Sequence, residues 1–285
     1  MRVVLLLALL TLLAVPTLQD RPKLQLLLSS SLSAPIAQRL TELVLLSSNA
    51  TYDIILQPRP LASLPAGSYV LSFGDTSVTR SMITEKDLSG LGAEGFIIRS
   101  GTIQVSGGWI TVFAADGVAP NPKITDFFPP ERPIPNTGRN YACYALLEKL
   151  GFAFLHPLQP HIPSPPSYNI DLFFEVQKSP KWPLRGWHYH TEHPLDLTNF
   201  LNGWGLNSTN DAAGWASMMP DWHKFLEWLV ANRQNAIEFL LLAADEWQSF
   251  VASATRQQRL RNITDAGYAW GVAIAADIPI AERQQ

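Results

Sequence analysis

The stretch RGWHYHTEHP, residues 185–194, decides how the chain is organised. It holds three of the six histidines, and eight of the nine tryptophans lie at or beyond Trp182. The residues before it have the pattern of a signal segment and a mixed domain, whereas those after it alternate between strand and helix patterns. We therefore expect this stretch to be the first strand of a parallel sheet, with polar residues at its C-terminal end.

Composition limits the classes of protein to consider. At 285 residues the chain has room for about two domains, and 47% hydrophobic with 16% charged residues is typical of packed proteins. The net charge of −3 offers no basic face, so no nucleic-acid partner is expected. Cys143 is the single cysteine, which excludes an intrachain disulfide.

Residues 1–20 have the features of a secretory signal peptide. Arg2 precedes an apolar run over residues 3–15, interrupted only by Thr11, that is too short to span a membrane. We expect a secreted, extracellular protein with no membrane span after signal removal, and an uncleaved signal anchor is the alternative. Asn-x-Ser/Thr sequences at Asn49 and Asn207 are candidate glycosylation sites in such a protein.

Residues 21–175 carry several short strand patterns and two helix patterns. The strand patterns lie at residues 23–28, 52–56, 69–73, 95–99, 102–105 and 110–114, and a helix pattern covers 34–46. The last three strands follow one another with turn residues between them, Ser100-Gly101 and 106–108, which indicates an antiparallel meander. We therefore predict an α+β domain with an antiparallel sheet and helices on one face.

The clearest helix of this domain begins near Thr137. Its apolar residues recur at helical spacing from Cys143 to Leu150, and Gly151 follows where a left-handed C-terminal cap is expected. Residues 152–155 then have a strand pattern that predicts a return to the sheet.

Residues 176–285 change to regular alternation. Strand patterns at 184–190, 235–243 and 271–278 are separated by helix patterns at 220–233, beginning at Pro220, and 249–267. This order predicts a parallel sheet built from βα units. We expect the N-terminal part of a (β/α)8 glycosidase-type barrel, an incomplete TIM barrel with its first three βα units, because a full barrel needs about 250 residues.

Two stretches resemble a known group of enzymes. TGRNYACYALLEKLGF, residues 137–152, resembles a helix of the accessory domain that precedes the barrel in bacterial-type beta-hexosaminidases and alpha-glucuronidases. Arg185-Gly186 resembles the start of the first barrel strand in the hexosaminidases, where the arginine contacts sugar hydroxyls. The resemblance therefore implies a carbohydrate substrate and makes Arg185 a candidate contact with it.

The sequence also departs from that group. The acidic residue expected a few positions after the arginine is replaced by the histidine-rich segment 188–193. The group's catalytic Asp-Glu pair follows the fourth barrel strand, whereas Asp245-Glu246 follows the second predicted strand. The catalytic residues are therefore left unassigned, and no cofactor is expected.

The candidate binding residues are polar or aromatic residues near predicted strand ends: Arg185, Trp187, His188, His190, Glu192, His193, Asp245 and Glu246. His188 and His190 share a strand face, and Glu192 joins them if the strand continues. Arg185 lies on the other face unless Gly186 kinks the strand. Asp277 ends the third predicted strand, and Trp204 and Trp215 fall in a predicted loop where they could stack on sugars.

Three interpretations of the histidines are open. They can hydrogen-bond sugar hydroxyls beside Trp187, bind a divalent metal as a His-x-His pair, or serve as structural residues. Asp245 and Glu246 can likewise bind substrate or begin the next helix. We expect an O-glycosyl hydrolase acting on a polysaccharide or glycan, present as an N-terminal fragment that lacks the main catalytic carboxylates. The alternatives are a non-catalytic carbohydrate-binding protein and a metal-dependent hydrolase.

Overall fold

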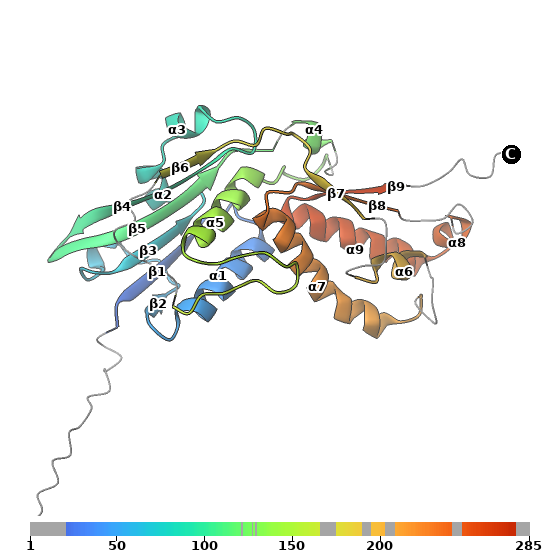
Figure 1. Ribbon diagram of the computed structural model, residues 1–285, viewed down its shortest axis with the longest axis horizontal. Helices are drawn as coiled ribbons and strands as arrows, with labels where there is room; N and C mark the ends of the chain where they lie inside the picture. The colour runs from blue at the N-terminus through green and yellow to red at the C-terminus, as the bar shows by residue number, and fades with distance from the viewer. Residues whose placement is uncertain are drawn as a thin grey trace, which may run out of the picture.

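The chain forms two β-sheets that lie end to end, with helices packed on them (Figure 1). The computed structural model describes residues 21–120, 122–126, 128, 130–165, 175–189, 195–202, 209–240 and 247–277. Among the helices of these residues, none combines the length and the apolar character that a membrane crossing requires.

The first sheet has six strands in the order β2-β1-β3-β5-β4-β6. Their bounds are β1 Lys23–Leu28, β2 Asp53–Ile55, β3 Tyr69–Phe73, β4 Phe96–Val105, β5 Gly108–Gly117 and β6 Glu175–Lys178. The strands β2, β1, β3 and β5 run parallel, and only β4 is antiparallel to its neighbours β5 and β6. β6 crosses the predicted domain boundary, so this sheet extends to Lys178.

The prediction of an antiparallel sheet is therefore wrong, and so is the prediction of a three-strand meander. Ser100-Gly101 does not turn the chain but lies inside the ten-residue strand β4, where pairing with β5 keeps the backbone extended. The hairpin turn that joins β4 and β5 is Ser106-Gly107, with Gly107 at φ +91°. The parallel pairs arise because the chain crosses back between strands, through α1 (Ala34–Ser48) in the case of β1 and β2.

Helices cover both faces of this sheet, whereas the sequence predicted helices on one face only. On β5, Phe113 packs in the cluster that contains α1 and α5 (Thr137–Lys149). Its neighbours Val112 and Ala114 pack on the other face, in clusters with Val78 of α2 (Ser77–Met82) and with Ile83, which precedes α3 (Glu85–Ser89). Alternate residues of one strand thus enter two cores, which is why the middle of β5, from Val112 to Ala115, is apolar.

The ends of α5 follow from its local sequence. Asn136, not Thr137, is the N-cap, and its side-chain oxygen accepts a hydrogen bond from the Arg139 backbone N–H at 3.0 Å. Gly151 lies at φ +100°, and its N–H and that of the next residue return to Glu148 and Leu147 in a Schellman motif, which confirms the predicted C-cap. The strand predicted at 152–155 is wrong, because in that segment only Ala153 makes an isolated bridge.

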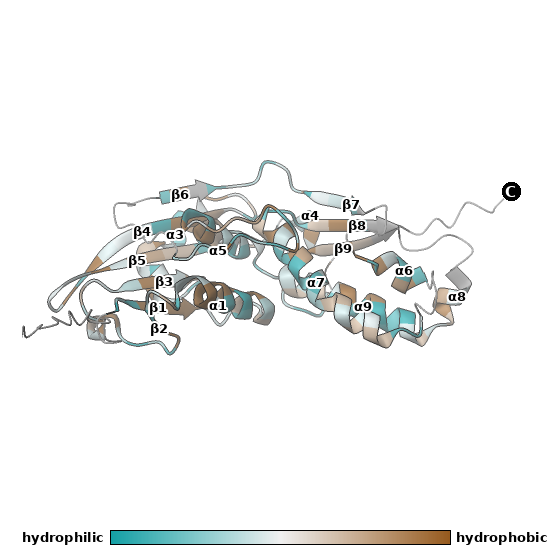
Figure 2. Cartoon of the chain, turned by 60° about the horizontal axis from the view of Figure 1, so that its bottom comes forward, coloured by the Kyte–Doolittle hydropathy of each residue, from teal (hydrophilic) through white to brown (hydrophobic). Residues whose placement is uncertain are grey.

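The second sheet confirms the predicted βα alternation. β7 (Gly186–Tyr189), β8 (Ala236–Leu240) and β9 (Ala273–Asp277) are parallel and adjacent, and α7 (Ala212–Ala231) and α9 (Ala254–Trp270) connect them. The short helices are η2 Leu61–Ser63, α4 Pro122–Thr125, α6 Leu197–Asn202 and α8 Trp247–Val251. Figure 2 shows α7 and α9 on the same side of the three strands.

α7 begins eight residues before the predicted start. Asp211 caps it by accepting from the Gly214 N–H at 2.7 Å, and Pro220 lies inside the helix. Proline cannot donate to the carbonyl one turn earlier, which belongs to Ala216. Both residues are exposed, so water can satisfy that carbonyl. Proline thus looked like a helix start in the sequence although it interrupts only the solvent side of a longer helix.

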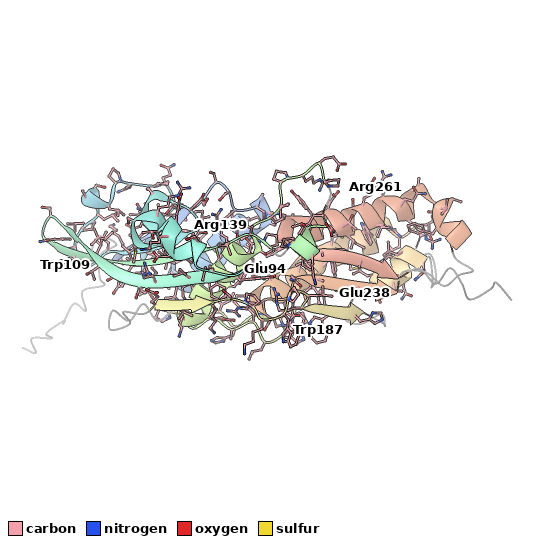
Figure 3. All side chains as sticks on the ribbon, turned by 90° about the horizontal axis from the view of Figure 1, so that it is seen from above. Glu94, Trp109, Arg139, Trp187, Glu238 and Arg261 are labelled. Atoms are coloured by element: carbon pink, nitrogen blue, oxygen red, sulfur yellow. The ribbon has the colours of Figure 1, made fainter. Side chains whose placement is uncertain are left out.

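Glu94 joins the two sheets. Its side chain is 1% exposed and accepts hydrogen bonds of 3.1–3.2 Å from Thr137, Tyr141, Arg185 and Asn235. These donors come from α5 and from the segments entering β7 and β8, and Figure 3 places Glu94 between the sheets. Glu94 also has φ +59°, a conformation that few residues other than glycine adopt.

A second buried pair supports the same junction. Arg39 of α1 donates to Glu227 of α7 at 2.9 Å, and the Tyr144 hydroxyl of α5 donates to the same carboxylate at 3.2 Å. Burial raises the pKa of Glu227, and the charge of Arg39 opposes that rise. Three helices from both halves of the chain are thus tied together beneath the sheets.

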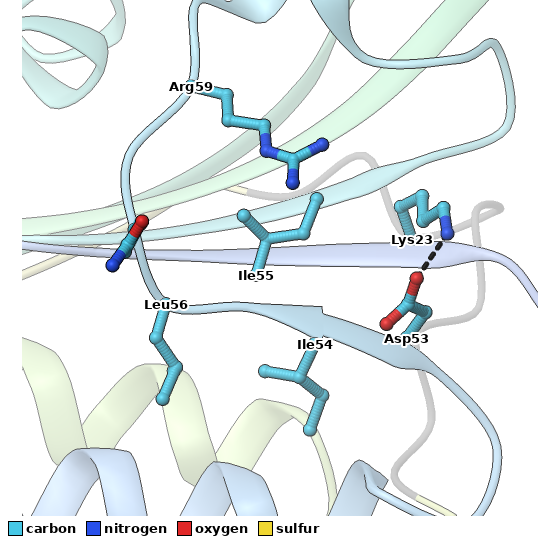
Figure 4. A pocket seen from close by; sticks show the side chains of 7 residues that line it. Lys23, Asp53, Ile54, Ile55, Leu56 and Arg59 are labelled. Carbon is cyan, nitrogen blue, oxygen red and sulfur yellow. Dashed lines mark hydrogen bonds and ion pairs between the residues drawn. The ribbon is translucent and has the colours of Figure 1, made fainter.

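The outer edge of the first sheet is short and charged. Lys23 of β1 pairs with Asp53 of β2, which has only three residues (Figure 4). Figure 4 shows Ile54 and Ile55 on opposite sides of β2, as a strand requires. A short edge with charged side chains resists pairing with strands of other molecules. The hollow beside it lies at this sheet edge and is lined by that pair, by Gln57 and Arg59, and by apolar residues of β2 and the residue after it.

The C-terminal ends of β1, β3 and β5 meet in a polar cluster. Asp75, which follows β3, accepts hydrogen bonds from Ser29 and Ser31, which follow β1. Arg139 of α5 lies 3.4 Å from Asp75 and donates to Asp116 of β5 at 2.7 Å. Burial opposes the ionisation of Asp75, but the two hydroxyls and the guanidinium outweigh it and lower its pKa to about 2.

We predict that Glu94→Ala lowers the free energy of unfolding by about 3–5 kcal/mol, because the largely buried Arg185 would lose its counter-charge and Asn235 one of its acceptors. Urea unfolding followed by tryptophan fluorescence measures the change. Glu175→Ala is the control, since Glu175 is half-exposed in its pair with Arg99 and should contribute 1 kcal/mol or less. Equal effects of the two substitutions would contradict the role of Glu94.

We predict that Asp75→Asn flattens the acid limb of the stability curve. The folded pKa lies below the ordinary 3.8, so Asp75 stabilises the fold above pH 3.8 and this stabilisation is lost as the pH falls towards 2. The loss amounts to about 2 kcal/mol, which the asparagine variant should not show. Urea unfolding at pH values between 5 and 2 measures it. Asp221→Asn, in an exposed pair with Lys224, is the control and should keep the wild-type slope.

Candidate functional site

One face of the second sheet packs on helices, and on its other face the described residues place a single short helix, α4, at one end. Ile237 of β8 is buried in the main core, and the Trp187 ring of β7 packs against Trp228 of α7 with 5.4 Å between ring centroids. The next residues, His188 and Glu238, are 50% and 53% exposed on the other face. We call this second surface the open face.

The open face is built in layers. Gly186, Ala236 and Ala273 are paired across the three strands and form a layer of small residues. The cluster of Ile124 and Phe128 packs against Ala273 and Ala236, so the segment around α4 closes the N-terminal end of this face. The small side chains leave a hollow of about 350 Å³ above the strands.

The next layer towards the C-terminal ends of the strands is polar. His188 and Glu238 are paired in the sheet register, with 3.7 Å between His188 Nδ1 and Glu238 Oε2. This distance is longer than a direct hydrogen bond, and a hydroxyl or a water could bridge the two groups. An imidazole can donate or accept a hydrogen bond, and a carboxylate accepts one. The pair can therefore donate to a ligand hydroxyl from His188 and accept from the same hydroxyl at Glu238.

Arg185 lies in the junction and not on the open face. Its Nε donates to the Arg233 carbonyl at 2.6 Å, its Nη1 to Glu94 at 3.1 Å, and its Nη2 to the Tyr141 hydroxyl at 3.2 Å. It also precedes β7, at the end of the sheet away from the C-terminal ends of the strands. This geometry favours a structural role for Arg185 over the expected contact with sugar hydroxyls.

Gly186 does not kink the strand, because it pairs regularly with Ala236. A Cβ atom there would lie 3.2 Å from the Ala236 Cβ, which explains why glycine suits this position. The expected stacking surfaces also differ from prediction. Half of the Trp187 ring stays exposed while the rest packs on Trp228, and Trp215 is buried in α7 and not in a loop.

Several predicted positions lie outside the described residues. These are His190, Glu192, His193, Asp245, Glu246, Asn207 and Trp204. In sequence, His190 and Asp245 come after the C-terminal ends of β7 and β8, and Asp277 is the last residue of β9. Among the described residues, no group of three His, Cys, Asp or Glu could hold a metal ion. The sugar-binding and metal-binding roles of these positions remain predictions.

Sequence reasoning missed Glu238 and Glu94. Glu238 had a visible signal, since it is the one charged residue in the strand Ala-Ile-Glu-Phe-Leu, and a carboxylate there must face solvent or a polar site. Glu94 had none, because its four partners lie 43 to 141 residues away in the chain.

Comparisons with known proteins give structural neighbours but no sequence family. No family model matches the sequence, and no curated protein does. One solved structure that overlaps it is CpGH84D, with 10% sequence identity, 89% of this chain covered and a TM-score of 0.44. Another is BtGH115A, a family GH115 4-O-methyl-alpha-glucuronidase with specificity for decorated arabinogalactans, with 12% identity, 90% of this chain covered and a TM-score of 0.45. A third is a mutant Streptomyces plicatus beta-hexosaminidase in complex with the product GlcNAc, with 9% identity, 91% of this chain covered and a TM-score of 0.41.

The chain spans 33%, 29% and 42% of the lengths of those three proteins, in the same order. At these identities and TM-scores the likeness assigns the chain to none of their groups.

Proposed function

We propose that this chain is part of a secreted carbohydrate-active protein, an O-glycosyl hydrolase, and that the open face binds its sugar. The observation that carries the proposal is the His188–Glu238 pair above a hollow in a parallel sheet. Parallel βα sheets bind ligands towards the C-terminal ends of their strands, and this pair is two residues further in that direction than the small layer. The resemblance of residues 137–152 and of Arg185-Gly186 to glycosidase sequences supports it.

The chemistry of the pair suits hydroxyl recognition. The Glu238 carboxylate accepts a hydrogen bond from a sugar hydroxyl, and His188 donates to the same oxygen. Each hydrogen bond to a charged group contributes about 1.5–3 kcal/mol when water is excluded. Because both residues are half-exposed, further enclosure of the open face would strengthen binding.

The proposed hydrolase needs more than these two residues. Glycosidases use two carboxylates on either side of the scissile bond, about 5–10 Å apart. On the described strands of the open face, Glu238 and the terminal Asp277 are the acidic residues. We infer that this chain contributes the accessory domain and the first strands of a glycosidase-type barrel, and that it has no substantial hydrolase activity by itself. Asn49, exposed after α1, is its proposed glycosylation site.

We predict that the purified chain binds at least one polysaccharide in a pull-down panel of chitin, xylan, cellulose and arabinogalactan. His188→Ala and Glu238→Gln should each weaken that binding about tenfold or more, because each removes one hydrogen bond to the sugar. His156→Ala is the control, since His156 is exposed in the segment after α5, outside the second sheet, and should change nothing.

Retention of binding by both variants would contradict the open-face site. Hydrolysis of aryl glycosides by this chain would contradict its proposed inactivity. A non-catalytic carbohydrate-binding protein is the second candidate function. A longer form of the protein that binds the same glycan without cleaving it would favour that alternative.

A further inference from the structure

A cleft of about 500 Å³ lies in the first sheet, remote in sequence from the open face. Asp75, Asp116 and Arg139 line it together with Arg80 and Asn136. We propose that this cleft is a second binding site and that its ligand is a small neutral polyhydroxyl molecule, such as a monosaccharide or a polyol. Below it is called the strand-end cleft.

The topology of the sheet places a crevice there. β1 has β2 on one side and β3 on the other, so the chain leaves β1 in one direction and later returns on its far side. Because of this reversal, the segments that follow β1 and β3 leave the sheet in opposite directions. Ligands of parallel sheets commonly bind in the crevice that opens between such segments. The cleft lies beside this point: Asp75, which follows β3, and Asp116, near the end of β5, line it, while Ser29, which follows β1, donates to Asp75 from outside the lining.

Glycines allow the backbone segments of the cleft to approach closely. A Cβ atom on Gly117 would lie 2.3 Å from the Gly138 carbonyl carbon, and one on Gly138 would lie 2.5 Å from two carbonyl oxygens. This contact brings the first turn of α5 onto the end of β5 and sets Arg139 over the strand ends. Gly74, at φ +78°, likewise has Ser29 and Arg139 where a side chain would be.

The cleft keeps one donor and one acceptor available. Arg139 uses Nε for Asp116 and Nη1 for Ser31, and its Nη2 makes no hydrogen bond with the described residues. Asp116 uses Oδ1 for Arg139 and for the Gly117 N–H, and its Oδ2 likewise has no hydrogen bond there. Neither atom is among the buried unsatisfied groups of the structure, so both retain contact with solvent.

The charges disfavour an anion as the ligand. Asp75, Glu85 and Asp116 are opposed by Arg80 and Arg139, which leaves one excess negative charge in the lining. Both arginines are also paired, Arg80 with Asp75 at 3.2 Å and Arg139 with Asp116. A phosphate or sulfate would find no free positive centre. A metal ion is disfavoured because guanidinium groups occupy the carboxylates.

A neutral polyhydroxyl ligand matches the remaining groups. Each hydroxyl both donates and accepts, so two neighbouring hydroxyls can receive from Arg139 Nη2 and donate to Asp116 Oδ2 at the same time. The size of the cleft falls within the range of small-molecule sites. This assignment uses no residue of the open face, so it does not depend on the function proposed above.

The test measures binding of myo-inositol and of methyl α-D-glucopyranoside to the full chain by saturation-transfer NMR, with sulfate and phosphate as anionic probes. We expect at least one neutral probe to bind in the millimolar range. Asp116→Asn should weaken that binding about tenfold. Arg80→Ala should weaken it severalfold and fold normally, because Arg80 is 61% exposed at the mouth. Arg132→Ala is the matched control, in an exposed pair with Asp265, and should bind as the wild type does.

His188→Ala separates this site from the open face and should leave probe binding unchanged. The proposal is overturned if no neutral probe binds, or if sulfate or phosphate binds in place of the neutral probes. It is also overturned if His188→Ala abolishes binding while folded Asp116→Asn and Arg80→Ala proteins keep it.

Discussion

The fold depends on one buried carboxylate. Glu94 accepts hydrogen bonds from side chains of α5 and of the segments that enter β7 and β8, so a single group sets where the second sheet begins relative to the first. A buried charge is tolerated only when its partners satisfy it, and Arg185 supplies the opposite charge here. The position of the open face, and hence of His188 and Glu238, follows from this junction.

Local sequence patterns predicted the elements better than their pairing. The apolar stripe and Gly151 gave α5 and its C-cap, and the alternation after residue 185 gave three parallel strands. The strand order of the first sheet could not be derived, because parallel neighbours such as β3 and β5 are separated in the chain by two helices and a strand. Ser100-Gly101 shows the same limit, since pairing with β5 keeps extended what would be a turn in isolation.

The candidate site was predicted in part. Strand periodicity made His188 a candidate, whereas Glu238 lay unnoticed within an apolar strand, and Arg185 lies before the N-terminal end of β7, away from the open face. The helix signature at 137–141 also acquires a physical meaning. Thr137 and Tyr141 donate hydrogen bonds to Glu94. Asn140 donates to the Trp270 carbonyl, and Arg139 donates to Asp116 in the strand-end cleft. One helical turn therefore contacts both the junction at Glu94 and the strand-end cleft.

The spacing of the Glu94 partners also has a consequence for biosynthesis. The ribosome delivers the chain from its N-terminus, and N-terminal units generally fold first. Thr137 and Tyr141 emerge within 47 residues of Glu94, but Asn235 emerges 141 residues after it. The nascent first sheet must therefore hold a half-satisfied carboxylate at its surface until β8 has been synthesised. During that interval the exposed junction is the part of the chain that chaperones would be expected to protect.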